Sequence, residues 1–256
     1  MWHAMKRDQL VIALIKASQI VEFLVSAGET DLATIARELR LPKSTVRRLL
    51  LTLISIRYVE QNPQNSNYRI SRRFVELGLR VMEHYDFVHA SRPFMLELAE
   101  KTGETVNLGV LDGPEIVCLD QVSSKHSLRQ DQPLGSRILS HCTSFGKSIL
   151  AYLPEHELDG LFEGKTFETL TAKSLRTYED LKRELKLIRT RGYAVDDEEA
   201  VAGVRCVGAA IFNHHAKPVA ALSVAGPVIR ITKDRIKQLG PLVRNTANSI
   251  SERLGA

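Results

Sequence analysis

The chain has 256 residues, of which 44% are hydrophobic and 25% charged, proportions that are ordinary for soluble globular proteins and allow two domains. Its net charge of +5 is uneven, because residues 1–74 carry 12 basic and 6 acidic side chains while residues 75–256 carry 23 and 24. The three cysteines are an odd number in a chain without a secretory leader, which fits a reducing cytoplasm. No internal repeat or low-complexity tract occurs, so a repeat or low-complexity protein is excluded.

Residues 10–25 are the most apolar stretch near the amino terminus, but Lys16, Ser18, Gln19 and Glu22 interrupt it. The stretch is too short and too polar to span a membrane, and it lacks the order of a signal peptide. We therefore expect it to be the first packing helix of the amino-terminal unit, and we expect no membrane partner.

Two consecutive segments carry apolar residues at the spacing of one helical face, with a short turn through Arg40 and Leu41 between them. The first stripe comprises Leu32, Ile35, Ala36 and Leu39. Pro42, which suits a first helical turn, opens the second helix. The second stripe comprises Val46, Leu49, Leu50 and Leu53. This order predicts a helix-turn-helix.

The second helix is expected to expose hydroxyl and cationic side chains opposite its apolar stripe: Lys43, Ser44, Thr45, Arg47, Arg48 and Thr52. Arg reaches guanine edges in a major groove, and Ser and Thr reach phosphates. Residues 40–73 hold eight Lys or Arg against one acid, Glu60, which is the charge of a surface that meets phosphate. Charge alone favours a solvated surface on an ordinary helical domain, and only its combination with helix-turn-helix spacing and a wing favours DNA.

Two β-prone runs, 57–60 and 67–70, flank a turn-forming segment at 62–66 and predict a hairpin that completes a winged helix. Arg69, Arg72 and Arg73 lie on this wing and its exit, where they are placed to touch the DNA backbone. We assign residues 1–73 to a winged helix-turn-helix DNA-binding domain. Residues 74–91 are expected to be a linker helix, with a helical pattern over 74–89 that packs against a second copy.

The remainder, residues 92–256, alternates predicted hairpins with helices. The expected elements are a helix over 93–101 ended by Gly103, strands over 105–111 and 115–122, a helix over 145–153, a helix after a capping box at Thr177 and Asp180 that ends at Gly192, strands over 206–212 and 219–225, and a helix over 233–254. Antiparallel hairpins with interspersed helices predict the α+β class.

Motifs for catalysis or cofactors are incomplete. Residues 145–148 end like a P-loop, but His141 occupies the position of the glycine that the phosphate cradle requires. Neither His141 nor the 214–215 histidine pair has zinc-ligand spacing. Cys142 and Cys206 lie in or next to apolar runs, where small buried thiols are common and inert. We expect no catalytic residue, metal or cofactor; a thiol redox enzyme that uses Cys142 or Cys206 is the rival from another class.

Several short motifs occur together in this chain. They are LPKSTVRRLL at 41–50, YRI at 68–70, ELG at 76–78, GETVN at 103–107, HCTSFGK at 141–147, GYAVDDEE at 192–199, GVRC at 203–206 and ALSVAGP at 221–227. In these motifs and their order the chain resembles the IclR family of transcriptional regulators, over roughly residues 10–252.

The resemblance implies a winged helix, a linker helix and a GAF-like domain, at 92–256, that binds an effector and oligomerises. It also implies a homodimer or dimer of dimers on double-stranded operator DNA with an inverted repeat, and a small carboxylate as effector. By motif, the effector pocket would be formed by Ser144, Phe145, Asp196, Cys206 and Ser223. The carboxylate would meet the backbone amides of Ser144 and Phe145, since N–H groups at a helix start suit an anion. For Cys206, a place in the core is an equally good interpretation.

Three positions depart from the family pattern. Ala225 stands where several carboxylate-sensing members have a second serine, and Phe145 places a large ring where a small residue is frequent. Both departures speak against a glyoxylate- or pyruvate-like effector and leave room for an aromatic or bulkier acid. Arg40 replaces a glycine often found before the recognition helix, so it is expected to cost turn stability and to add a phosphate contact.

The leading hypothesis is a ligand-responsive regulator, repressor or activator, of a catabolic operon. A ligand-blind architectural DNA-binding protein, in which the second domain only oligomerises, is the second rival.

Overall fold

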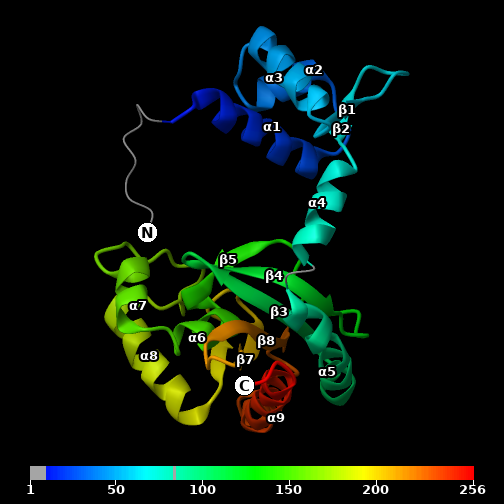
Figure 1. Ribbon diagram of the computed structural model, residues 1–256. Helices are drawn as coiled ribbons and strands as arrows, with labels where there is room; N and C mark the ends of the chain where they lie inside the picture. The colour runs from blue at the N-terminus through cyan, green and yellow to red at the C-terminus, as the bar shows by residue number, and fades with distance from the viewer. Residues whose placement is uncertain (1–9, 83–84) are drawn as a thin grey trace. The chain divides into compact units, whose positions relative to one another are not determined.

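The computed structural model describes residues 10–82 and 85–256, which divide into two compact units (Figure 1). The first unit ends at Tyr85 and the second begins at Asp86. The fold is α+β, as the sequence predicted: the first unit is mainly helical with a small hairpin, and the second is built on a large antiparallel sheet.

The first unit is a helix-turn-helix followed by a hairpin. Its elements are α1 (Ile12–Ala27), α2 (Leu32–Glu38), α3 (Lys43–Ser55), β1 (Val59–Gln61), β2 (Tyr68–Ile70) and α4 (Arg73–Met82). Asp31 caps α2, because its carboxylate accepts from the amides of Ala33 (2.7 Å) and Thr34 (3.1 Å). The antiparallel pair β1–β2 and its turn form the predicted wing.

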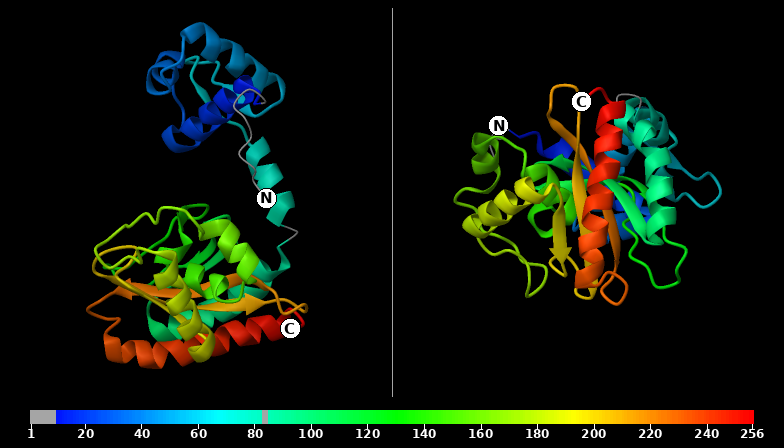
Figure 2. Two further views of the ribbon diagram at one scale, coloured as in Figure 1. Left: turned by 90° about the vertical axis from the view of Figure 1, so that its left-hand side faces the viewer. Right: turned by 90° about the horizontal axis from the view of Figure 1, so that it is seen from below.

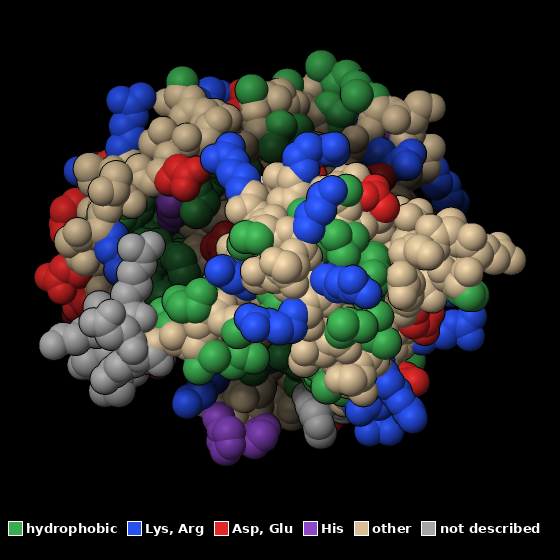
Figure 3. All heavy atoms as spheres, turned by 90° about the horizontal axis from the view of Figure 1, so that it is seen from above, with side chains coloured by type: hydrophobic (Ala, Val, Ile, Leu, Met, Phe, Trp, Pro, Cys, Tyr) green, Lys and Arg blue, Asp and Glu red, His purple; other side chains and the backbone are tan. Residues whose placement is uncertain are grey.

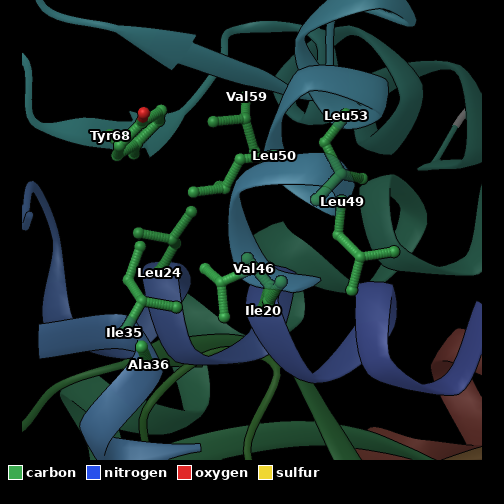
Figure 4. Close-up of a cluster of buried hydrophobic side chains, with 10 residues drawn as sticks. All are labelled: Ile20, Leu24, Ile35, Ala36, Val46, Leu49, Leu50, Leu53, Val59 and Tyr68. Atoms are coloured by element: carbon green, nitrogen blue, oxygen red, sulfur yellow. The ribbon is translucent and has the colours of Figure 1, made fainter. Parts of the chain in front are cut away.

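One apolar core joins the first three helices to the wing (Figure 4). The predicted stripe of α3 is its centre, and Val46 and Leu50 have no solvent exposure at all. Ile20 and Leu24 of α1 and Val59 of β1 close this core around them. Since the apolar face of α3 is used inside the unit, its polar face is left for a partner.

The linker differs from the single helix predicted over 74–89. Helix α4 ends at Met82, and a new helix starts at Asp86. Residues 83–84, which the predicted helix includes, lie outside the described residues. The described part of the linker therefore belongs to two helices, one in each unit.

Helix α5 (Asp86–Thr102) runs through Pro93, where the sequence predicted a helix start. A proline inside a helix removes one backbone donor and usually kinks or ends the helix. Here Val88 and Met95, on either side of the proline, are both buried against the second unit's core, while Pro93 itself is exposed. Tertiary packing thus holds the helix on both sides of the missing donor.

The second unit contains a six-stranded antiparallel sheet in the order β5-β4-β3-β8-β7-β6. The strands are β3 (Thr105–Asp112), β4 (Glu115–Val122), β5 (Arg137–Leu139), β6 (Ala194–Asp197), β7 (Val204–Phe212) and β8 (Pro218–Pro227). The two predicted hairpins, β3–β4 and β7–β8, are confirmed, and they join edge to edge through β3 and β8. The short edge strands β5 and β6 were not predicted.

Helices cover both faces of this sheet (Figure 2). They are η2 (Ser140–Cys142), a single 3₁₀ turn, then α6 (Ser144–Leu150), α7 (Glu155–Phe162), α8 (Tyr178–Arg191) and α9 (Lys233–Arg253). Helices α5 and α9 contact each other and pack on one face, and α6 packs on the other with α8 against it. Of the helices in the described part of the chain, none combines the length and apolar composition needed to cross a bilayer.

Helix α8 begins and ends as the sequence predicted. The Thr177 hydroxyl accepts from the amide of Asp180 at 3.1 Å, which is the predicted N-cap contact. Gly192 ends the helix in the left-handed region, with φ of 79°.

Candidate DNA-binding surface and effector pocket

Helix α3 presents a polar face to solvent. Its exposed side chains are Lys43, Ser44, Arg47, Arg48 and Thr52, and Thr45 is half-buried. None of the ion pairs found among the described residues of the first unit involves Lys43, Arg47 or Arg48. These cations can therefore meet phosphate without breaking an internal pair.

Leu51 is a residue of this face that the sequence reasoning missed. It is 58% exposed, follows Arg47 and Arg48 by one helical turn, and lines a groove with Ser44 of α3 and Gln61 of the wing. Figure 3 shows Lys and Arg side chains interleaved with hydrophobic ones over this unit. An apolar side chain on a recognition face can contact the methyl group of thymine. Its position outside the buried stripe was the signal that could have identified it.

The predicted cations of the wing are not equivalent. Arg69 pairs with Glu60 at 3.2 Å and with Glu29 at 3.6 Å, so a phosphate would have to displace these carboxylates. Arg72 is exposed and takes no part in any ion pair found among the described residues. Of the two, Arg72 is the better candidate for a backbone contact.

Glu29 links the turn between α1 and α2 to the wing through hydrogen bonds. Its carboxylate accepts from the side-chain amides of Asn62 (2.9 Å) and Asn65 (2.8 Å) in the wing turn. These two hydrogen bonds hold the pKa of Glu29 below its usual value, so the carboxylate stays charged. An isolated backbone bridge between Thr30 and Tyr68 adds a second attachment.

Arg40, in the turn before α3, has a φ of 53°, in the left-handed region. L-residues other than glycine adopt this region at a cost. The conformation agrees with the expected cost in turn stability at a position where the family often has glycine.

The second candidate site lies on the face of the sheet that α6 covers. Direct cross-strand neighbours in an antiparallel sheet project to the same face. One row across the sheet is Asp196, Cys206 and Ala225. The next row is Gly208, Ser223 and Asn107. Four strands thus bring together residues that are far apart in the sequence.

Glycines let α6 approach this face closely. A Cβ atom on Gly208 would lie 2.8 Å from the carbonyl carbon of Ser144 and 2.9 Å from the amide nitrogen of Phe145. A Cβ atom on Gly109 would lie 2.7 Å from the Phe145 ring. The ring therefore packs over β3, in a cluster with Ile116, Ile149 and Ala221.

A cavity of about 40 Å³ remains between α6 and the sheet. All five predicted effector residues line it: Ser144, Phe145, Asp196, Cys206 and Ser223. Three further polar residues that the prediction did not include, Asn107, Gln130 and Gln132, also line it, as does Ala225. As it stands, the cavity accommodates a very small ligand and not an aromatic acid.

Hydroxyl and amide groups gather where α6 starts. The Ser144 and Ser223 hydroxyls are hydrogen-bonded at 2.9 Å. Thr143 caps the helix by accepting from the amide of Gly146 at 3.1 Å. The amides of Ser144 and Phe145 have no acceptor among the described residues, so they are free to donate to a ligand in the cavity.

Asp196 is the acidic residue of the cavity and is almost fully buried. Its carboxylate accepts from the amide of Glu199 at 2.7 Å and is hydrogen-bonded to the Cys206 thiol. Burial raises the pKa of Asp196 to about 6, while nearby Lys147 lowers it in part. The side chain therefore gains or loses its proton near neutral pH.

Lys147, from the motif that resembles a P-loop, is used inside the unit. It is completely buried, and its Nζ donates to Glu199 Oε1 at 2.5 Å and to the carbonyl of Val195 at 2.7 Å. Burial raises the pKa of Glu199 to about 7, although Lys147 favours its charged form. No phosphate could reach this ammonium group without unfolding the turn after β6.

Cys118 and Cys142 are buried like small core residues, whereas Cys206 is partly buried and lines the cavity. Burial raises the pKa of Cys118 and of Cys142 to about 11, and it raises the pKa of Cys206 well above its usual value. Thiols in this state are protonated at neutral pH and are poor nucleophiles. Within the described residues, no group of three or more His, Cys, Asp or Glu side chains is arranged to hold a metal ion.

Comparisons with known proteins cover both units of the chain. Residues 13–63 match the IclR helix-turn-helix domain, and residues 79–252 match the carboxy-terminal domain of bacterial IclR transcriptional regulators. The transcriptional repressor IclR of Escherichia coli K12 is 33% identical over 244 residues, which are 94% of this chain and 89% of that protein.

Solved structures share the fold over nearly the whole length. The crystal structure of Thermotoga maritima IclR is 31% identical, covers 96% of this chain and 100% of its own, and has a TM-score of 0.80. An IclR homologue from Microbacterium hydrocarbonoxydans in complex with 4-hydroxybenzoate shares the fold at 20% identity, with 94% and 98% of the chains covered and a TM-score of 0.81. This chain belongs to the IclR family of bacterial transcriptional regulators.

Proposed function

We propose that this protein is a cytoplasmic transcription regulator that binds double-stranded operator DNA and responds to a small organic acid from the catabolic pathway it controls. The observation that carries the DNA part is the exposed face of α3, where Lys43, Arg47 and Arg48 lack internal ion pairs within the described residues. Ser44, Thr45 and Thr52 supply hydroxyls on the same helix, and Arg72 extends the basic surface past the wing.

The effector would place its carboxylate at the free amides of Ser144 and Phe145, with the Ser223 hydroxyl beside it. Asp196 cannot face that carboxylate while both are charged, so it accepts from a ligand hydroxyl or becomes protonated. The cavity of about 40 Å³ favours an acid of two or three carbons. The Microbacterium homologue binds an aromatic acid, and such a ligand would require this cavity to open.

A second copy of the chain would supply the second half of the operator contact. A two-fold dimer binds inverted half-sites about one or more helical turns apart. Helix α4 offers an apolar surface for this pairing, since Val75 and Leu79 are 62% and 64% exposed. We propose a homodimer or a dimer of dimers in which α4 forms part of the contact.

Neither rival function is favoured by the geometry. A thiol redox enzyme needs a thiolate, and burial keeps all three cysteines protonated. A ligand-blind architectural protein has no use for a cavity lined by free backbone donors and a buried carboxyl group.

The DNA part is tested with Arg48→Ala in a binding titration at fixed salt. Loss of one base contact weakens operator binding by about 1–3 kcal/mol and relaxes specificity, whereas loss of a phosphate contact weakens all sequences alike. Arg183→Ala removes the same charge from an exposed site on α8 and serves as the control. Unchanged operator affinity of Arg48→Ala would contradict this docking.

The effector part is tested by a thermal-shift screen of metabolic carboxylates, followed by DNA binding with each hit. A ligand at about a hundred times its dissociation constant stabilises the fold by about 2.7 kcal/mol, which is a shift of several degrees. Ser223→Ala should reduce the shift by removing a hydrogen bond, and Ala225→Ser should improve binding of the smallest oxo acids by restoring a donor. A screen in which no carboxylate shifts the melting temperature would show that the pocket is wrongly assigned.

A further inference from the structure

Asn107 of β3 has an unpaired hydrogen-bond acceptor. Its side chain is only 4% exposed and lines the cavity. The amide oxygen Oδ1 is buried and has no hydrogen-bond partner among the described residues. Buried polar atoms are nearly always paired in folded proteins, because an unpaired one has lost its water without replacement. An orphaned oxygen on a cavity wall marks the place where a ligand donor belongs.

The position of Asn107 relates this oxygen to the proposed carboxylate site. Asn107 is the direct cross-strand neighbour of Ser223, whose hydroxyl bonds to Ser144 at the start of α6. Neighbouring strands lie about 4.8 Å apart. A ligand whose carboxylate reaches the amides at the start of α6 lies in the same cavity that Asn107 lines.

The other polar groups of the cavity agree with a ligand that donates. Asp196 presents a second acceptor, and no cationic side chain lines the cavity in the described structure. The carboxylate end of the ligand is thus met by neutral donors, and Asn107 Oδ1 and Asp196 offer acceptors elsewhere in the cavity, whose lining also includes Gln130 and Gln132. An oxo group could accept from Nδ2 of Asn107 but would leave Oδ1 unpaired, and an unsubstituted carbon would leave it unpaired as well.

We propose that Asn107 is a specificity-determining residue that accepts a hydrogen bond from a hydroxyl group on the effector, so that the pocket selects a 2-hydroxy acid of two or three carbons over the oxo or unsubstituted acid of the same size. This inference rests on the effector pocket described under the proposed function. Sites built to hydrogen-bond a ligand hydroxyl discriminate strongly against analogues that lack it. We expect a preference of at least tenfold.

The test is calorimetric titration of the full-length protein with matched acids: both enantiomers of lactate, pyruvate and propionate, and the two-carbon pair glycolate and acetate. Lactate and glycolate should bind at least tenfold more tightly than the other acids of equal length. In Asn107→Leu, which keeps a similar volume without polar atoms, the acids of one length should bind within about threefold of one another. Ser223→Ala is the matched control, because it should weaken every acid while the preference for the hydroxyl remains.

The outcomes separate the two proposals. Equal or tighter binding of pyruvate or propionate by the unmodified protein overturns the role of Asn107 and leaves the effector pocket standing. A preference for the hydroxy acid that remains in Asn107→Leu also overturns the role of Asn107 and leaves the effector pocket standing. If none of the acids binds, both the role of Asn107 and the small-acid pocket are overturned. Since Asn107→Leu removes an unpaired buried oxygen, its melting temperature without ligand should be no lower than that of the unmodified protein, and a folded variant is expected.

Discussion

The two units treat their charged side chains in opposite ways. In the first unit, the cations of the recognition helix stand in solvent without internal partners among the described residues. In the second unit, two ion pairs have a buried member: Lys147 with Glu199, and Arg230 with Glu104 at 2.7 Å. The cavity has no cationic side chain among its described lining residues, and Asp196 is the carboxyl group that lines it.

The difference shows which partner each surface is built for. Unpaired surface cations attract a polyanion over a distance, and salt weakens that attraction. Buried ion pairs attract nothing from solvent; they fix the walls of a cavity in which hydrogen bonds select the ligand. We therefore expect this chain to combine a salt-sensitive contact with DNA and a salt-insensitive contact with the effector, each of which can be disturbed without the other.

The largest expected effect is that of salt on DNA binding. If the three unpaired cations of α3 meet phosphates in each half of a dimer, six contacts form, and raising salt from about 50 to 200 mM should weaken operator binding about a thousandfold. Binding of the small acid should change by less than about twofold over this range. Operator titrations and calorimetry at matched salt concentrations measure both, and similar salt slopes for the two ligands would refute the distinction.

Breaking the buried pair should be the most damaging single substitution in the second unit. Lys147→Met leaves Glu199 buried without its cation, which costs about 3–5 kcal/mol in the free energy of unfolding. Lys173→Met breaks a pair with Glu198 whose lysine is half exposed, so solvent screens it and the loss of stability should be much smaller. Urea unfolding of both variants provides the comparison. Equal losses would mean that burial of the pair has no energetic consequence.

Asp196 should make the second unit less stable as pH rises. Its pKa is about 6 in the folded chain and 3.8 ordinarily, so the folded state holds a proton that the unfolded state releases between these values. This contribution is complete below about pH 4 and is lost as pH rises through 6, a change of up to about 3 kcal/mol. Asp196→Asn keeps an acceptor for the Glu199 amide and should remove this part of the dependence. The measurement is the change in unfolding free energy between pH 4.5 and 7.5, in the unmodified protein and in Asp196→Asn. An equal change in the two proteins would contradict the prediction.

The smallest effect concerns the turn before α3. Arg40→Gly relieves a left-handed φ of 53° and should stabilise the first unit by about 1 kcal/mol. Arg37→Gly, in the last turn of α2, places glycine at a helical position and should destabilise it by a similar amount. Melting temperatures of the two variants should move in opposite directions. If Arg40 also contacts phosphate, its loss should flatten the salt slope of DNA binding by about one.

Local features of the fold were predictable from sequence, and features set by distant neighbours were not. The stripe through Val46 and Leu50, the cap at Thr177 and the stop at Gly192 depend on residues within one helix. The edge strand β5 has three residues and carries no pattern of its own. Helix α5 passes through Pro93 because tertiary packing outweighs the local rule.

The site divides in the same way. The five effector residues predicted from the motif resemblance, among them Ser144 and Phe145, all lie among the residues that line the cavity. The size of the cavity could not be predicted, since it depends on the Phe145 ring lying over Gly109. The sequence identifies Asn107 only as a member of the 103–107 motif. Its importance depends on its cross-strand neighbour Ser223 and on its own Oδ1 atom, which has no hydrogen-bond partner among the described residues.

The Glu29 attachment has a consequence for the timing of recognition. One carboxylate joins the turn between α1 and α2 to Asn62, Asn65 and Arg69 of the wing, and α3 shares the core beneath them. The spacing between the recognition helix and the wing is therefore set when the chain folds, before any DNA arrives. The protein therefore loses little further conformational freedom when it binds DNA. An operator whose grooves match the spacing of α3 and the wing should bind without rearrangement of this unit. A duplex with a different groove spacing would itself have to bend or twist, so we expect operator binding to depend on the stiffness of the DNA as well as on its bases.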